Sequence, residues 1–110
     1  MATIDFKQLV KDMLTAAKGH LGAGWKEARP YAESEFKAFA ENIKLIEKLK
    51  LAGTIDEERA RLHMNIQKNS IRMVLLTIEG IGILAVENAI NAAISVVQDT
   101  VNKALGWSIL

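Results

Sequence analysis

The main clue to the fold is the segment 74–90, which reads VLLTIEGIGILAVENAI. It is almost apolar enough to cross a membrane, but Glu79 and Glu87 interrupt it. A membrane-spanning helix needs about 20 predominantly apolar residues. A charged side chain near its centre costs about 2.5–3.5 kcal/mol on insertion scales. Because two glutamates offset much of the gain from insertion, we favour a helix that is surrounded by protein.

The charged residues are unevenly distributed along the 110 residues. Residues 1–70 carry 22 of the 27 charged side chains, and residues 71–110 carry only five. Half of the chain is hydrophobic, with one proline and few aromatic residues, a composition that favours helices. The sequence therefore predicts a single all-α domain over 1–110. Charged amphipathic helices are expected over 1–70, and an apolar core or interface helix over 71–110.

The first half of the chain predicts two helices. Asp5 is a good N-cap, and Gln8 three residues later completes a capping box. Three glycines within residues 19–24 weaken or end this first helix, and Pro30 suits the first turn of a second one. The apolar positions keep their phase across the glycines, so one long helix over 5–52, kinked near Pro30, is the alternative to a break at Gly22–Gly24.

A third helix is expected directly after Gly53, which reads as the residue that ends the second helix. Thr54 and Glu57 form a capping box, and the helix runs toward Glu79. The short turn implies that the second and third helices are antiparallel neighbours. The residues expected to face inward are Ile55, Leu62, Ile66, Met73 and Leu76.

A last helix is expected from Ile83 to Leu105, ended by Gly106. Its polar residues fall on one narrow stripe, and the remaining positions are apolar. Whether 54–105 forms one helix or two depends on Gly80 and Gly82, and a break or bend there is favoured.

A helix that is apolar on nearly all sides needs cover on nearly all sides. We therefore expect an antiparallel bundle of three to four helices that is completed by oligomerisation. Alanines spaced by four residues along the last helix would allow a close approach of a second helix. The predicted interface residues are Gly82, Ala85, Val86, Ala89, Ile90, Ala93, Ile94 and Val97.

Three charged residues in the apolar part could set the register of such an assembly: Arg72, Glu79 and Glu87. One interpretation places the glutamates at the margin of a helix, facing solvent or a lysine of the second helix. The other pairs them with Arg72 or with a base of another subunit, which would fix register rather than add stability.

The sequence shows no pattern that is typical of an active site. A di-metal carboxylate bundle needs Glu-x-x-His on one helix face, and neither histidine has a glutamate three residues before it. A metal site would have to assemble across helices or subunits from Glu33, Glu79, Glu87 and His63. The chain has no cysteine and no Gly-x-Ser-x-Gly segment. We therefore predict no catalytic residue, no metal and no cofactor, and a protein that is not an enzyme.

These patterns favour a structural or protein-interaction subunit that self-associates through its apolar C-terminal helix. Its expected partners are copies of itself and other proteins of a larger assembly; a net charge of +1 gives no reason to expect nucleic acid. The alternative is a membrane-associated protein that inserts residues 71–98, and the third hypothesis is a metal–carboxylate bundle. The first 14 residues lack the apolar core of a secretory signal, so a cytoplasmic protein is expected.

Overall fold

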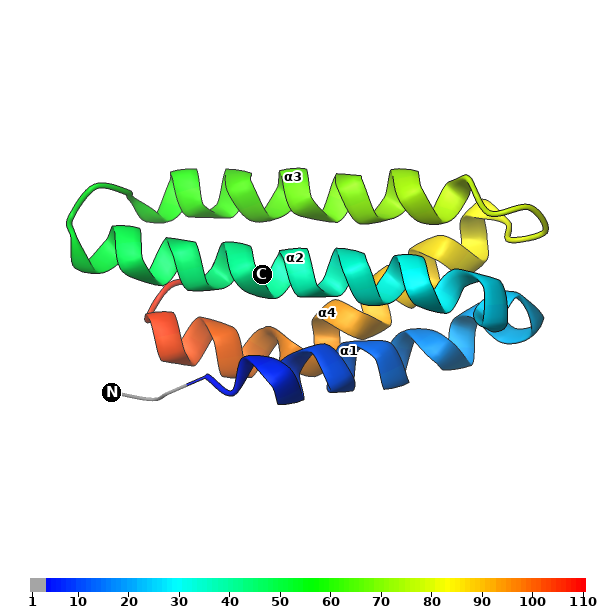
Figure 1. Ribbon diagram of the computed structural model, residues 1–110. Helices are drawn as coiled ribbons and strands as arrows, with labels where there is room; N and C mark the ends of the chain where they lie inside the picture. Colours follow the sequence, from blue (N-terminus) through cyan, green and yellow to red (C-terminus); the bar gives the residue numbers. More distant parts are fainter. Residues whose placement is uncertain (1–3) are drawn as a thin grey trace.

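The computed structural model describes residues 4–110, and the first three residues of the predicted single domain lie outside this range. The chain forms an elongated bundle of 44 × 22 × 18 Å (Figure 1). As predicted, it is all-helical. The elements are α1 (Phe6–Leu21), a 3-10 helix (Gly22–Gly24), α2 (Trp25–Leu51), α3 (Glu57–Leu76) and α4 (Ile83–Leu105). Successive α-helices run in opposite directions along the long axis (Figure 1).

The beginning and end of α1 agree with the sequence. The Asp5 carboxylate accepts a hydrogen bond from the backbone N–H of Gln8 at 3.1 Å, which confirms the N-cap. The helix ends at Leu21 because Gly22 adopts φ 54°, a conformation that costs glycine nothing. The alternative of one long helix is therefore wrong.

The predicted start of the second helix at Pro30 is wrong, because α2 begins at Trp25 and carries Pro30 inside it. The 3-10 helix Gly22–Gly24 leads directly into α2, so α2 begins five residues before Pro30. Pro30 is exposed, and as the sixth residue of α2 it leaves the Lys26 carbonyl without the N–H donor that another residue would supply.

The turn between α2 and α3 is partly as expected. Gly53 has φ 72° and follows the last helical residues, as predicted. The N-cap of α3 is Asp56, whose carboxylate accepts from the N–H of Arg59 at 2.8 Å, so the predicted cap at Thr54 is wrong. The Thr54 hydroxyl instead donates to the Leu49 carbonyl at 3.2 Å and stays with the end of α2.

Two helices, not one, occupy the segment 54–105. α3 ends at Leu76, and a turn with Gly80 at φ 87° separates it from α4. The bounds of α4 are those predicted. Residues 71–98 are therefore not one continuous helix, and within residues 4–110 no helix combines the length and apolar character needed to cross a membrane.

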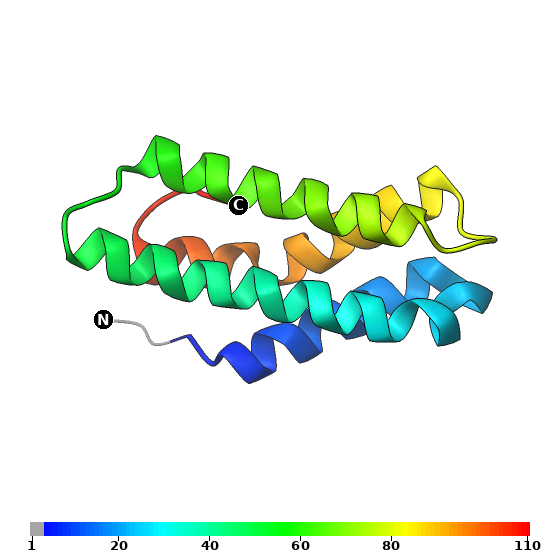
Figure 2. The ribbon, with the colours of Figure 1, turned by 45° about the horizontal axis from the view of Figure 1, so that its top comes forward.

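One apolar core runs the length of the bundle, and α4 contributes most to it. α4 lies mainly against α1, α2 lies between α1 and α3, and α3 forms an edge of the bundle (Figure 2). Fully buried alanines on all four α-helices allow this close packing: Ala17, Ala28, Ala32, Ala60, Ala89 and Ala93. Among the residues that the structure describes, every buried side chain is hydrophobic.

The last five residues fold back onto the bundle. Ile109 is buried in the core, and the Asn102 side-chain oxygen accepts from the N–H groups of Ile109 and Leu110 at 3.0 and 3.1 Å. On the other side of this tail, Arg61 donates to the Ser108 carbonyl at 3.1 Å. The tail thus ties α4 to α3 at the end where the α2–α3 turn lies (Figure 1).

Candidate interaction surface

Helix α3 carries two apolar stripes on opposite faces. Its buried residues are Ala60, Met64, Ile71 and Leu75. The residues predicted to face inward from this helix form the other stripe, and they are exposed: Leu62 by 55%, Ile66 by 66%, Met73 by 69% and Leu76 by 38%. The prediction for these four is wrong. Residues two apart differ by about 200° around a helix, so the two stripes have the same spacing, and spacing cannot tell which one is inside.

Polar contacts with α2 fix one flank of α3. The Asn42 amide donates to the Gln67 side chain at 2.8 Å, and the Ser70 hydroxyl donates to the Glu35 carboxylate at 2.8 Å. All four side chains are half-buried. These contacts hold the rotation of α3 about its own axis, with the second stripe facing solvent.

An ion pair with α4 fixes the other flank. The Arg72 guanidinium donates through two nitrogens to the two carboxylate oxygens of Glu87, and both side chains are about one-third exposed. These hydrogen bonds, then the charges of Arg72 and Lys68, lower the pKa of Glu87 below its ordinary value, although partial burial opposes the shift. The same pairing raises the pKa of Arg72. Of the predicted register-setting charges, the structure thus brings Arg72 and Glu87 together.

Glu79 does not join this pair. It lies exposed in the turn between α3 and α4. Its position matches the interpretation of a glutamate that faces solvent.

The exposed stripe has the spacing of a coiled-coil seam. We call it the outer face of α3 and define it by Leu62, Ile66, Asn69, Met73 and Leu76. Successive members are four, three, four and three residues apart, the alternation that keeps one side of a helix turned toward a partner helix. Within residues 4–110 this face has no covering helix, because the neighbours of α3 lie on its flanks and behind it.

The predicted interface on α4 is instead filled by the same chain. Six of its eight residues are at most 7% exposed: Val86, Ala89, Ile90, Ala93, Ile94 and Val97. Ala85 is half-buried, and Gly82 is exposed as the N-cap residue. The rest of the chain covers these six residues, with α1 as the main neighbour of α4.

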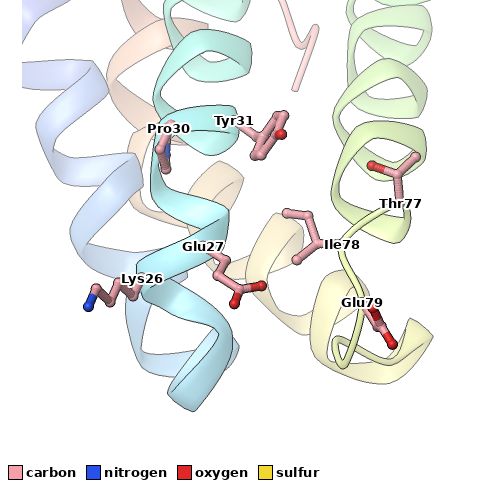
Figure 3. Close-up of a pocket in the computed structure, with 7 residues that line it drawn as sticks. All are labelled: Lys26, Glu27, Pro30, Tyr31, Thr77, Ile78 and Glu79. Carbon is pink, nitrogen blue, oxygen red and sulfur yellow. The ribbon is translucent and has the colours of Figure 1, made fainter.

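A hollow of about 410 Å³ lies between the first turns of α2 and the turn after α3 (Figure 3). Its lining residues are Lys26, Glu27, Pro30, Tyr31, Thr77, Ile78 and Glu79. Glu27 and Ile78 point toward each other across it, whereas Lys26 points away to the other side of α2 (Figure 3). The hollow is open, and all of its lining side chains except Ile78 are exposed. It offers carboxylates and one aromatic ring at the surface rather than an enclosed site.

The structure does not bring the candidate metal ligands together. Glu33 pairs with Lys37 at 3.1 Å on α2, and His63 is exposed on α3. Within residues 4–110 no three histidine or acidic side chains lie close enough to hold one ion.

Comparisons of this chain with protein-family models, with curated proteins and with solved structures found no match. The evidence for the outer face of α3 as an interaction surface is therefore its geometry alone. Sequence reasoning identified its residues as an apolar helical stripe but placed them inside. The second apolar series, which begins at Ala60 and continues through Met64 and Ile71, was the available signal that α3 has two such faces.

Proposed function

We propose that the protein is a non-enzymatic structural or interaction subunit that self-associates. The observation that supports this proposal is the outer face of α3, where four large apolar side chains are 38–69% exposed on one side of the helix, two before Asn69 and two after it. Contiguous apolar patches on a monomer mark interaction sites more often than single exposed residues do.

Two further exposed apolar residues follow the α3–α4 turn. Ile83 and Leu84, in the first turn of α4, are 70% and 74% exposed. They enlarge the apolar surface that the isolated chain leaves in water, and burying apolar surface contributes about 25 cal/mol per Å².

The net charge is compatible with the association of identical copies. At +1, long-range repulsion between two chains is small, so burial of apolar surface can dominate at ordinary salt concentrations.

Sedimentation velocity of the purified chain at concentrations from about 1 to 500 μM tests the proposal, because this range brackets Kd values of weak complexes. We expect the mass to rise above the 12.1 kDa of one chain as concentration increases. A mass that stays at one chain throughout would overturn the proposal.

A further inference from the structure

The outer face of α3 is nearly symmetric about Asn69. Leu62 and Leu76 each lie seven residues from it, and Ile66 and Met73 lie three and four residues from it. Consider two antiparallel copies of α3 aligned at Asn69. Leu62 of one copy then lies opposite Leu76 of the other, and Ile66 lies within one residue of the position opposite Met73. The face is therefore complementary to a second, antiparallel copy of itself, which is the condition for an interface with two-fold symmetry.

Asn69 is suited to the centre of such an interface. Its side-chain oxygen accepts a hydrogen bond from Arg72, and among the described residues its amide nitrogen donates to no group of the chain. An asparagine side chain is both donor and acceptor, so two copies related by a two-fold axis can bond to each other. A single polar residue in an apolar seam also fixes the register of the two helices.

The antiparallel arrangement is favoured over the parallel one by the helix dipoles. Each end of α3 then lies beside the opposite end of its partner, where the partial charges attract. The position of α3 at the edge of the bundle leaves space for this approach, because α1 lies on the far side of the molecule (Figure 1, Figure 2).

The size of the face indicates how strong the pairing is. From Leu62 to Leu76 the face spans about 21 Å at 1.5 Å per residue, and a helix is about 10 Å wide. Two such faces bury on the order of 400–700 Å², which is below the standard size and falls in the class of weak, reversible interfaces. We expect dissociation constants in the micromolar range.

We propose that two copies of this chain pair through the outer face of α3, antiparallel, about a two-fold axis that passes near Asn69. This inference rests on the proposed self-association and adds its surface and its geometry.

Cross-linking of single-cysteine variants tests the geometry, because the chain contains no cysteine of its own. The variants are Leu62→Cys and Leu76→Cys, treated separately and as a mixture with a bis-maleimide reagent of about 10 Å reach, which matches the distance between packed helices. Antiparallel pairing places position 62 beside position 76 of the other copy. It places the two copies of position 62 about 21 Å apart, which is fourteen residues of helix rise.

We expect cross-linked dimers in the mixture and almost none with either variant alone. Val96→Cys is the matched control, since Val96 is 50% exposed on α4, outside the face. Efficient cross-linking of Leu62→Cys with itself would show a parallel pair and overturn the inference. So would cross-linking of Val96→Cys as efficient as that of the mixture.

Ile66→Glu separates this inference from the proposed function. Two added carboxylates near the axis repel each other, so we expect self-association to weaken at least about tenfold, with an unchanged circular dichroism spectrum. If the wild-type chain associates and Ile66→Glu associates equally well, the surface is wrong while self-association stands. If the wild-type chain is monomeric at every concentration, both fall, and a different protein would be the partner of this face.

Discussion

Helices α3 and α4 are neighbours in sequence and both are rich in apolar residues, but they differ in how many of these residues are buried. α4 buries nine of its side chains, whereas α3 buries four and exposes a second apolar stripe of similar length. The difference follows from position: α4 packs extensively along α1 and also contacts α3, whereas α3 contacts α2 and α4 less extensively and lies at an edge. Apolar content alone therefore does not distinguish a core helix from a helix with a free apolar face.

The two helices are also held in place by different forces. α4 begins at Gly82 without a side-chain cap, and burial of its apolar face is its main source of stability. α3 depends more on polar contacts: the Asp56 cap at its start, the contacts of Gln67 and Ser70 with α2, and the Arg72 pair with Glu87. Substitutions that remove burial should act on α4, and those that remove polar contacts should act on α3.

The largest difference between the two helices is expected when a carboxylate is placed in the apolar face of each. Ala89→Glu puts an unpaired charge at a fully buried site of α4, at a cost of at least about 5 kcal/mol, which approaches the total stability of a small domain. Ile66→Glu changes a residue that is 66% exposed on α3. We expect it to alter the free energy of unfolding by less than about 0.5 kcal/mol when the protein is dilute enough to be monomeric.

Urea unfolding followed by circular dichroism measures both variants. Ala89→Glu should show little helix even without urea, and Ile66→Glu should unfold with the wild-type midpoint. A folded Ala89→Glu variant, or an Ile66→Glu variant that is as unstable as Ala89→Glu, would contradict the assignment of core and surface.

Much of the fold could be predicted from local chemistry. The bounds of α4, the Asp5 cap and the end of α2 at Gly53 follow from capping residues and apolar periodicity, which act within a few residues. The start of α2 could not be predicted from Pro30, because proline favours the first turn of a helix, whereas here it lies inside a helix that begins five residues earlier.

The candidate surface could be predicted only in part. The periodicity of Leu62, Ile66 and Met73 was recognised, but the rotation of α3 depends on contacts such as Asn42 with Gln67, which are 25 residues apart. The fold-back of Ile109 onto the core likewise depends on tertiary contacts. These long-range contacts determine which apolar residues remain exposed, and the spacing of residues along the sequence does not predict them.

A smaller effect is expected from removing the cap of α3. Asp56→Ala leaves the N–H of Arg59 without its acceptor and should lower the free energy of unfolding by about 1 kcal/mol. Thr54→Ala is the matched control: within residues 4–110 the Thr54 hydroxyl donates only to the Leu49 carbonyl, and its loss should cost less. Urea unfolding gives both values, and hydrogen exchange should show faster exchange in the first turn of α3 than in α4. If the two substitutions lower the free energy of unfolding equally, Asp56 is not the N-cap of α3.

The smallest effect concerns the ion pair that joins α3 to α4. Glu87→Gln removes a partly exposed pair and should lower the free energy of unfolding by about 0.5 kcal/mol at neutral pH and low salt. Because Arg72 lowers the pKa of folded Glu87 below its ordinary value of 4.5, the contribution is fully present above pH 4.5. It is lost as the pH falls through the lowered pKa, where the folded carboxylate also takes up a proton.

The difference between the wild-type chain and Glu87→Gln should therefore shrink in acid and in high salt, when urea unfolding is repeated across pH. Glu79→Gln makes the same change of charge in the exposed turn and is the matched control. If Glu87→Gln and Glu79→Gln follow the same pH profile, the pair does not hold α3 against α4. The rotation that turns the outer face of α3 to solvent would then rest on the α2 contacts of Gln67 and Ser70 alone.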